Sequence, residues 1–410
     1  MANEFAIKLN KYAEVAVTIG LNVQPGDLVT VDIDIDQAEF AHLLIEQAYR
    51  TGAKKVLMQW QDSVEQRLDL TYQRIADLQE TLPHDEVRQQ FIADKRVKRL
   101  VVKSASPDAL AGIEAAKIQV AQNTSTPGSR AVRQASRNNL LSWTIIAAAS
   151  PAWAQKVFPN EEAATATEHL WDAIFSATRL ETRDPIAAWR EQRERLETNA
   201  ATLNRYQFDR LHYVAPGTDL TIGLPHDHIW QAAGTTNERG EFFIPNLPTE
   251  EVFTAPDLKR VDGYISATKP LSYGGSVLEG LKFVFRNGQV VTATATKGQA
   301  ILDQLLQTDA GAKRLGEVAL VPDASPISQS GLIFYNTLFD ENASDHLALG
   351  AAYPFSIENG TAMNPLQLQK AGLNVSNTHV DFMVGSAQMS IDGITKAGEI
   401  VPVFRHGNWA

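Results

Sequence analysis

The chain of 410 residues contains no cysteine. Disulfide bonds, thiolate nucleophiles and cysteine-based zinc sites are therefore excluded, and the absence is compatible with a reducing cytoplasm. Long apolar runs are also missing, because no uninterrupted stretch reaches the roughly eighteen residues that a membrane span requires. The charged, amphipathic N-terminus lacks the apolar segment of a signal peptide. We therefore expect a soluble, cytoplasmic protein without a membrane partner.

Basic residues are fewer than acidic residues in this chain. The chain has 37 Lys and Arg residues against 48 Asp and Glu residues, which gives a net charge of -11. Binding to phosphate backbones requires a basic face, so we expect no nucleic-acid partner. Hydrophobic residues make up 44% of the chain, an ordinary globular balance. The length exceeds that of one ordinary core and predicts two domains.

Four common catalytic motifs are absent from the chain. There is no Gly-x-x-x-x-Gly-Lys-Ser/Thr loop, no Gly-x-Gly-x-x-Gly after the first strand, no Gly-x-Ser-x-Gly and no His-Glu-x-x-His. Phosphate-loop, dinucleotide-binding, serine-hydrolase and simple zincin chemistries therefore lose their main support.

The first half of the chain alternates helical and strand-like apolar patterns. A strand, a helix and a second strand at these lengths form a right-handed crossover in a parallel sheet. We expect strands at 28–31, 55–60, 99–102 and 143–148, and helices at 5–19, 37–51, 108–117 and 184–202.

The second half has short strand patterns between Gly, Pro and Asn turns. Asn287-Gly288 between two apolar runs predicts a type I′ hairpin, and one helix is expected at 298–306. The predicted fold class is α/β: an N-terminal α/β domain with a parallel sheet at 1–205, then a mixed α+β, β-rich catalytic domain at 206–410. The other strands expected in this half lie at 211–214, 220–223, 263–266, 282–285 and 289–293.

Carboxylates and histidines in the second half are the candidate functional groups. One residue separates His379 from Asp381, so on a strand both side chains point to the same face. Imidazole and carboxylate ligands suit zinc, cobalt or manganese, and a bridging carboxylate suits two ions a few ångströms apart. Two such ions polarise a scissile carbonyl and lower the pKa of a bridging water. The candidates are Glu250, Glu251, Glu317, His346, Tyr353, His379 and Asp381.

Taken singly, most of these residues have ordinary structural explanations. Glu317 could be a solvated strand end, His379 a hydrogen-bonded half-buried histidine, and Tyr353 a packing residue. Asp381 is harder to explain, because a carboxylate in an apolar run is costly unless it is paired or bound to a metal. From the residues alone, the set indicates only a metallohydrolase.

Three other polar clusters have simpler interpretations. The segment His226-Asp227-His228 follows a Gly-Leu-Pro sequence, which favours a turn. The alternating acids of 32–36 lie just before a helix, which favours N-capping and N-terminal charge. Asp340-Glu341 is interpreted as a solvated loop.

Together the candidate segments resemble a known family, the M29 metallopeptidases, which are the aminopeptidases of the T, S and PepS types. The resemblance runs from Val23-Gln24-Pro25-Gly26-Asp27 to the segment 379–386. Its most specific parts are 246–254, which contains Leu-Pro-Thr-Glu-Glu-Val-Phe, 315–321, which contains Gly-Glu-Val-Ala-Leu-Val, and the His-x-Asp segment.

The resemblance implies a dinuclear aminopeptidase that acts on peptides with free N-termini and forms homodimers. Glu251 is preferred to Glu250 because the family's ligand is the glutamate directly before Val-Phe; Glu250 would bind the substrate ammonium or be solvated. Tyr353 matches the family's active-site tyrosine, and Glu317 would also shuttle a proton. The implied ligands of two divalent ions (zinc, cobalt or manganese) are Glu251, Glu317, His346, His379 and Asp381.

Three alternatives remain at this point. The chain could be a metal-dependent hydrolase of another class, an amidase or a carboxypeptidase, which would act on N-blocked peptides. It could be a non-catalytic peptide- or metal-binding protein, although the intact ligand set argues against that. It could also be a scaffold whose β-rich half makes dimer contacts, in which case metal removal would change nothing.

Overall fold

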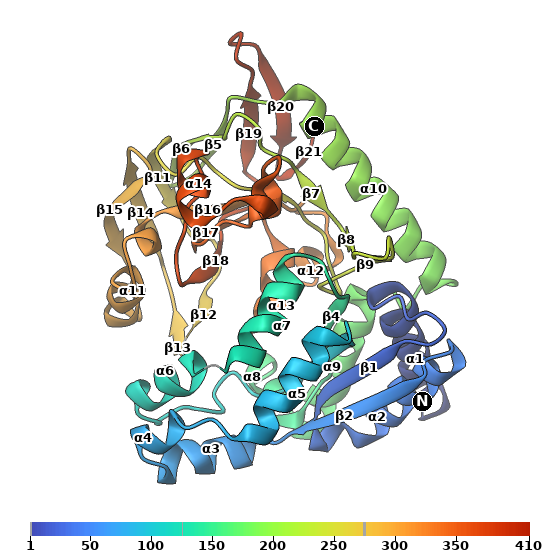
Figure 1. Ribbon diagram of the computed structural model, residues 1–410. Coiled ribbons are helices and arrows are strands. Elements are labelled where there is room, and N and C mark those ends of the chain that lie inside the picture. Colours follow the sequence, from blue (N-terminus) through green and yellow to red (C-terminus); the bar gives the residue numbers. More distant parts are fainter. Residues whose placement is uncertain (1, 125, 274–275) are drawn as a thin grey trace. The chain divides into compact units, whose positions relative to one another are not determined.

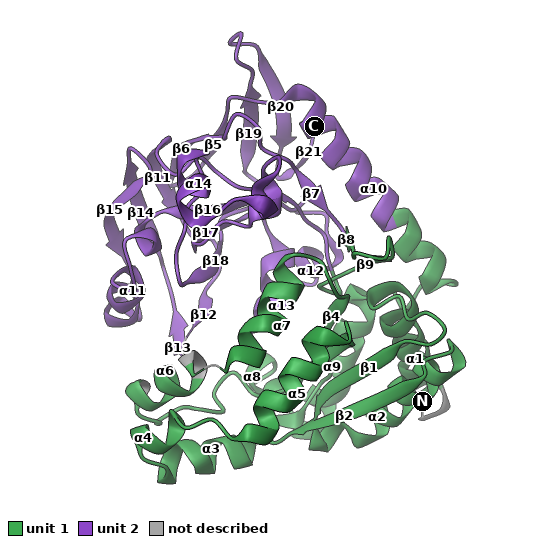
Figure 2. Cartoon of the chain, in the orientation of Figure 1, with its two compact units in different colours: residues 1–191, 234–248 green, residues 192–233, 249–410 purple. Residues whose placement is uncertain are grey.

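The computed structural model describes residues 2–124, 126–273 and 276–410. The chain divides into two compact units (Figure 2): unit 1 comprises 1–191 and 234–248, and unit 2 comprises 192–233 and 249–410. This division differs from the predicted single boundary at residue 205. The first boundary between the units falls inside the long helix at 185–206, and the chain returns to unit 1 at 234–248. The division into an N-terminal α/β domain at 1–205 and a catalytic domain at 206–410 stays a prediction.

Unit 1 contains a sheet flanked by helices (Figure 1). In chain order its elements are α1 (Ala2–Val15), η1 (Ala16–Gly20), β1 (Leu28–Asp34), η2 (Ile35–Gln37), α2 (Ala38–Arg50), β2 (Lys55–Gln61), α3 (Ser63–Tyr72), α4 (Ile75–Leu78), α5 (Pro83–Asp94), β3 (Lys98–Lys103), α6 (Ala115–Asn123), α7 (Pro127–Arg137), β4 (Trp143–Ala147), α8 (Pro151–Val157), α9 (Ala163–Ala177), the first part of α10 (Pro185–Tyr206), β8 (Thr235–Thr236) and β9 (Phe242–Phe243).

The four-stranded sheet of unit 1 is parallel throughout, with strand order β2-β1-β3-β4, and β8 and β9 form a separate antiparallel pair. The prediction of a parallel sheet with crossover helices is therefore confirmed. Helix α2 buries Phe40 and Leu44, and the ring of Tyr12 stacks on Phe40 at 5.3 Å. The Tyr12 hydroxyl donates a hydrogen bond to the carbonyl of Ala147 at 2.9 Å, which ties α1 to β4.

The helix expected at 108–117 is wrong in position. Residues 107–112 form turns, and the helix α6 begins only at Ala115. Gly112 has a φ of +80°, a left-handed conformation that stops a helix before it can propagate.

The segment 234–248 belongs to unit 1 through a buried ion-pair network. Lys98 is 1% exposed, and its Nζ lies 2.9 Å from both Asp27 Oδ2 and Glu241 Oε2. Arg239 contacts the same two carboxylates at 2.8 Å. The network thus joins this segment to the sheet by charge pairing as well as by packing.

Unit 2 is rich in strands. Besides the rest of α10, its elements are β5 (Arg210–Ala215), β6 (Thr218–Gly223), β7 (Gln231–Ala232), β10 (Val252–Thr254), β11 (Val261–Ser266), β12 (Leu271–Tyr273), β13 (Ser276–Leu278), β14 (Lys282–Arg286), β15 (Gln289–Thr294), α11 (Gln299–Leu306), η3 (Gly311–Lys313), β16 (Leu315–Leu320), α12 (Pro326–Gln329), α13 (Thr337–Asp340), η4 (Glu341–Ala343), β17 (His346–Gly350), η5 (Pro354–Ser356), η6 (Gly360–Ala362), α14 (Pro365–Lys370), β18 (His379–Met383), β19 (Ser390–Ile394), β20 (Ile400–Arg405) and β21 (Asn408–Trp409).

Two antiparallel sheets share the apolar core of unit 2. Their orders are β18-β17-β16-β10-β7 and β15-β14-β11-β6-β5-β19-β20-β21. One cluster of buried side chains draws on both sheets, for example Tyr213 from the larger and Phe382 from the smaller. The predicted hairpin is confirmed: Asn287 and Gly288 have φ of +50° and +76°, as a type I′ turn requires.

The fold class is confirmed as α/β, with a parallel sheet in unit 1 and antiparallel sheets in unit 2. Among the described residues, no helix is both long enough and apolar enough to cross a membrane.

Candidate metal centre

The five-stranded sheet of unit 2 has two chemically different faces, because side chains alternate along each strand. One face is apolar and packs into the core; its members include Val252, Val318, Leu320, Leu347, Leu349, Val380 and Phe382. The other face carries Glu317 from β16, His346 from β17, and His379 and Asp381 from β18. Glu251 directly precedes β10. The expectation that His379 and Asp381 share a strand face is confirmed.

Small residues stand between these polar side chains. Ala348 pairs with Glu317 on one side and with Asp381 on the other. His346 pairs with Ala319, and His379 pairs with Gly350. Directly opposite residues point to the same face. The alanines therefore leave open the volume around which the ionisable side chains gather.

Distances between the side chains define two groups that share one residue. His346 Nε2 lies 3.2 Å from Glu251 Oε2 and 3.7 Å from Glu317 Oε1. His379 Nε2 lies 3.4 Å from Glu317 Oε2 and 3.4 Å from Asp381 Oδ1. Each group could hold one metal ion by its geometry. Glu317 thus directs one carboxylate oxygen to each group.

The imidazole rings are oriented by backbone carbonyls. His379 Nδ1 lies 2.7 Å from the carbonyl oxygen of Ala351, and His346 Nδ1 lies 3.2 Å from that of Ser344. Carbonyls only accept hydrogen bonds, so both Nδ1 atoms carry protons and both Nε2 atoms face the carboxylates. An Nε2 lone pair facing a carboxylate requires a cation between them, either a proton or a metal ion.

The shifted pKa values of these side chains also indicate that the centre requires a cation. Burial acts to lower the pKa of His346 and His379. Hydrogen bonding to Glu251 and Glu317 outweighs it at His346, and Tyr353 with Asp381 and Glu317 outweighs it at His379, so both pKa values are raised well above the usual range. Burial raises the pKa of Glu251, with repulsion from Glu317 and Asp381 adding to it. The donor set therefore has the composition that divalent cations such as zinc, cobalt or manganese accept.

Glu341 was interpreted as part of a solvated loop, and that interpretation is wrong. The residue is 9% exposed, and burial together with repulsion from Asp381 and Glu251 raises its pKa well above the usual range. Asp340 is 4% exposed and accepts hydrogen bonds from the backbone N–H groups of Phe334 and Asn336. The signal available in the sequence was proximity, since Glu341 precedes His346 by only five residues.

Tyr353 follows β17 and lies against one of the histidines. Its ring centroid is 5.0 Å from that of His379, and it stacks on Phe355 at 5.1 Å. His379 acts to lower the pKa of Tyr353, but desolvation and the nearby carboxylates, including Glu317, outweigh it. With its pKa raised, Tyr353 keeps its proton at neutral pH and can donate a hydrogen bond.

Glu250 is buried, so the alternative interpretation that its side chain is solvated is wrong. It is 1% exposed, and its Oε2 accepts a hydrogen bond of 2.8 Å from Gln192 Nε2. Gln192, on α10, also donates to the carbonyl of Thr249 at 3.3 Å. The contacts secure the segment that carries Glu251.

Two polar segments remain, 226–228 and the alternating acids of 32–36; the prediction for the first is confirmed and that for the second is wrong. His226 and Asp227 form a turn, as expected, and the buried His228 bonds the carbonyl of Pro225 through Nδ1 at 2.8 Å. The N-capping expected of the alternating acids is wrong: Asp34 precedes η2 without a side-chain cap, and Gln37 occupies the N-cap of α2.

An α/β protein with two imidazoles and several buried carboxylates on one sheet face belongs to the class of metal-dependent enzymes. The chain is a member of the thermophilic metalloprotease (M29) family, whose profile matches residues 5–409. The predicted enzyme class, a metallo-aminopeptidase, is confirmed at this level.

Known relatives cover the whole chain. It is 47% identical over 406 residues to aminopeptidase PepS of Streptococcus thermophilus, covering 99% of this chain and 98% of that protein. It is 46% identical to aminopeptidase AmpS of Bacillus subtilis, covering 100% of both. The solved structure of wild-type AmpT from Thermus thermophilus superposes with a TM-score of 0.93 at 39% identity, covering 99% and 100% of the two chains.

A second solved structure shares the fold only. The 2,5-dihydroxypyridine dioxygenase of Pseudomonas putida matches 98% of this chain and 96% of its own, with a TM-score of 0.53 and 12% identity. At that identity the match carries no information about chemistry.

Proposed function

We propose that the protein removes N-terminal residues from peptides at a dinuclear metal centre. Glu251, Glu317 and His346 would hold one ion, and Glu317, His379 and Asp381 would hold the other. The observation that carries the proposal is the position of Glu317, whose two carboxylate oxygens face two different imidazoles at 3.7 Å and 3.4 Å. A carboxylate in that position is suited to bridging two cations.

The chain's own residues supply orientation and hydrogen bonding. Two divalent ions, when bound, would polarise the scissile carbonyl and acidify an attacking water. The carbonyls of Ser344 and Ala351 hold both rings with Nε2 toward the centre. Tyr353 keeps its proton and donates a hydrogen bond to the negative charge that develops on the carbonyl oxygen.

A carboxylate that lies in neither ligand group supports a free N-terminus as the substrate group. Four carboxylates surround two imidazoles, namely those of Glu251, Glu317, Glu341 and Asp381. Two bound divalent ions would offset the charge of the ligand carboxylates, so the group left to pair with the α-ammonium group of a peptide is Glu341. We include Glu341 in this role, as a carboxylate at the centre that lies in neither ligand group. The relatives named above as aminopeptidases support the same substrate class.

The test is a metal titration on paired substrates. Chelator-stripped protein receives zinc, cobalt or manganese in steps, and hydrolysis of a free dipeptide and of its N-acetylated form is followed. We expect activity to return at about two equivalents, and on the free N-terminus only. Metal-independent cleavage would contradict the centre, while equal cleavage of the blocked peptide would favour an amidase or carboxypeptidase. The Glu317→Gln variant should stay inactive, and Glu399→Gln, an exposed carboxylate of the same unit, should behave as wild type.

Two further properties stay predictions, the first from the family resemblance and the second from the composition of the chain and its N-terminus. They are a homodimeric assembly, which light scattering on the purified chain would test, and a cytoplasmic location, which cell fractionation would test.

A further inference from the structure

The parallel sheet of unit 1 has one apolar face and one polar face. On β1, Val29, Val31 and Ile33 are at most 1% exposed. The alternate residues Asp32 and Asp34 lie on the opposite face and are partly exposed. Central strands of parallel sheets are normally apolar on both faces, because helices cover both. Carboxylates on β1, which lies between β2 and β3, therefore call for an explanation.

The neighbouring strand β3 repeats the pattern with the opposite charge. Arg99 and Lys103 share the polar face, and Arg99 Nη2 lies 3.4 Å from Asp32 Oδ2. Asp34 Oδ2 accepts a hydrogen bond of 2.6 Å from Ser104 Oγ, just beyond the end of β3. Acidic groups on one strand thus face basic groups on the next.

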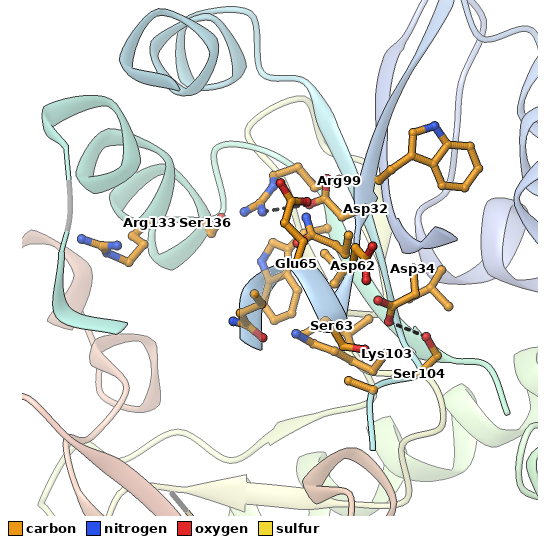
Figure 3. A pocket seen from close by; sticks show the side chains of 18 of the residues that line it. Asp32, Asp34, Asp62, Ser63, Glu65, Arg99, Lys103, Ser104, Arg133 and Ser136 are labelled. Carbon is orange, nitrogen blue, oxygen red and sulfur yellow. Dashed lines mark hydrogen bonds and ion pairs between the residues drawn. The ribbon is translucent and has the colours of Figure 1, made fainter. Parts of the chain in front are cut away.

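These side chains line a pocket of about 850 Å³ (Figure 3). Its lining comes only from unit 1: the sheet face forms one side, and residues from α3 and α7 complete it. The volume lies within the range of small-molecule sites, roughly 300–1,000 Å³. Trp60 and Trp143 add apolar surface to the lining.

The position of the pocket is one where open α/β sheets bind ligands. The strand order β2-β1-β3-β4 places successive strands on opposite sides of β1, so the topology switches between β1 and β3. Ligands in such sheets occupy the crevice outside the carboxyl ends of the strands at the switch point. Asp34 and Lys103 are the last residues of β1 and β3.

The charges of the lining are nearly balanced; Arg99 pairs with Asp32, whereas Arg133 lies apart from the acidic side chains. The acidic side chains are Asp32, Asp34, Asp62, Glu65 and Asp69, and the basic ones are Arg99, Lys103, Arg133 and Arg137. In Figure 3, Arg133 on α7 lies on the far side of the pocket from Asp34 and Asp62. A simple anion or cation would meet groups of its own sign, whereas a molecule with one charge at each end would meet opposite charges at both.

We propose that this pocket is a second binding site, which takes a zwitterionic ligand, a free amino acid or a short peptide. Asp34 and Asp62 hold its ammonium end, and Arg133 holds its carboxylate end. The pocket and the metal centre share no residue, because all of the lining residues belong to unit 1. The argument uses charge and topology and does not depend on the proposed peptidase activity.

A single introduced cysteine can report binding, because the chain has none of its own. Ser136→Cys places a fluorescent label at the wall of the pocket, and Val291→Cys, an exposed position in unit 2, serves as the control. Both full-length proteins are titrated with leucine, N-acetyl-leucine and leucinamide. The Glu317→Gln background prevents turnover of leucinamide and impairs the metal centre.

We expect a saturable response to leucine at position 136 only, and at least a tenfold weaker response to either blocked analogue. Arg133→Met, which changes an exposed side chain, and Asp34→Asn should each weaken leucine binding by a similar factor. Lys396→Met in unit 2 should leave it unchanged. No saturable response, an equal response at position 291, or equal binding of the blocked analogues would overturn the proposal. Equilibrium dialysis of radiolabelled leucine against protein without the fluorescent label gives a second count of the sites.

Discussion

The side-chain oxygen of Asn342 accepts a hydrogen bond of 2.7 Å from the backbone N–H of Glu250. The same side chain donates through Nδ2 to the carbonyl of Leu338 at 3.1 Å, and the residue is fully buried. Glu251 follows Glu250, and Glu341 precedes Asn342. One amide side chain therefore connects the two segments that carry these acidic groups.

Asn342→Ala removes that connection. The buried N–H of Glu250 loses its acceptor, which costs about 1–3 kcal/mol of unfolding free energy. We expect metal affinity to fall about 10- to 100-fold, because Glu251 loses the support of its backbone. Chelator competition measures the affinity, and urea unfolding measures the stability. Asn160→Ala, at an exposed position in unit 1, is the control; a metal affinity equal to that of wild type in Asn342→Ala would contradict the connection.

Ala348→Leu places a large side chain between Glu317 and Asp381. The side chain would occupy the volume proposed for the ions, so we expect loss of metal binding and of activity. Overpacking adds a destabilisation of about 1–3 kcal/mol, which leaves the fold in place. Metal content after dialysis and circular dichroism separate the two effects. Ala348→Gly, which adds no atom, should still bind metal; full metal content in Ala348→Leu would show that the ions bind elsewhere.

Tyr353→Phe removes a hydroxyl without changing the ring stack on Phe355. If the hydroxyl stabilises the developing oxyanion, kcat should fall about 10²-fold while KM changes little, because the contact strengthens only in the transition state. Steady-state kinetics on a free dipeptide measures both constants. Phe355→Leu tests the stack itself. A rise in KM with kcat unchanged would instead assign Tyr353 to substrate binding.

The Lys98 network predicts how unit 1 responds to acid. Burial acts to raise the pKa of Asp27, but hydrogen bonds from Lys98, from the backbone of Gln24 and from Arg239 outweigh it and hold the pKa below the usual value. Glu241 behaves in the same way through Lys98 and Asn237. A carboxyl whose pKa is lower in the folded state stabilises the fold above its unfolded pKa, about 4, and the contribution is lost as pH falls through the folded value.

Thermal unfolding between neutral pH and about pH 3 tests this expectation. Wild-type stability should fall as the pH drops below about 4, whereas Asp27→Asn should be less stable at neutral pH and lose less on acidification. Asp303→Asn, which changes a carboxylate outside the network, should follow the wild-type curve. Parallel curves for Asp27→Asn and wild type would show that Asp27 does not contribute.

Local patterns predicted much of the fold, because they act over a few residues. The turn at Asn287-Gly288 requires two positive φ angles, and those two residue types adopt them readily. The failure at 108–117 has an equally local cause, since Gly112 adopts a left-handed conformation inside a segment that otherwise looked helical.

Local sequence patterns predicted the burial and the interaction partners of acidic side chains least well. Asp340-Glu341 looked solvated because both residues are acidic, yet the chain buries both, at 4% and 9% exposure. Asp32 and Asp34 looked like helix caps because a helix follows, but they face basic and hydroxyl groups from β3 and its end. For Glu341, Asp32 and Asp34 the deciding neighbours come from distant parts of the sequence, whereas Asp340 accepts hydrogen bonds from the nearby backbone of Phe334 and Asn336.

The sequence by itself determined the alternation of strands and helices, the hairpin turns and the shared strand face of His379 and Asp381, since these follow from backbone periodicity. Only the tertiary structure decided that Glu317 stands between His346 and His379 with one oxygen toward each, and that Ala348 leaves the space open. The physical reason is that strand register sets which side chains meet across a sheet, and register depends on the packing of the whole unit.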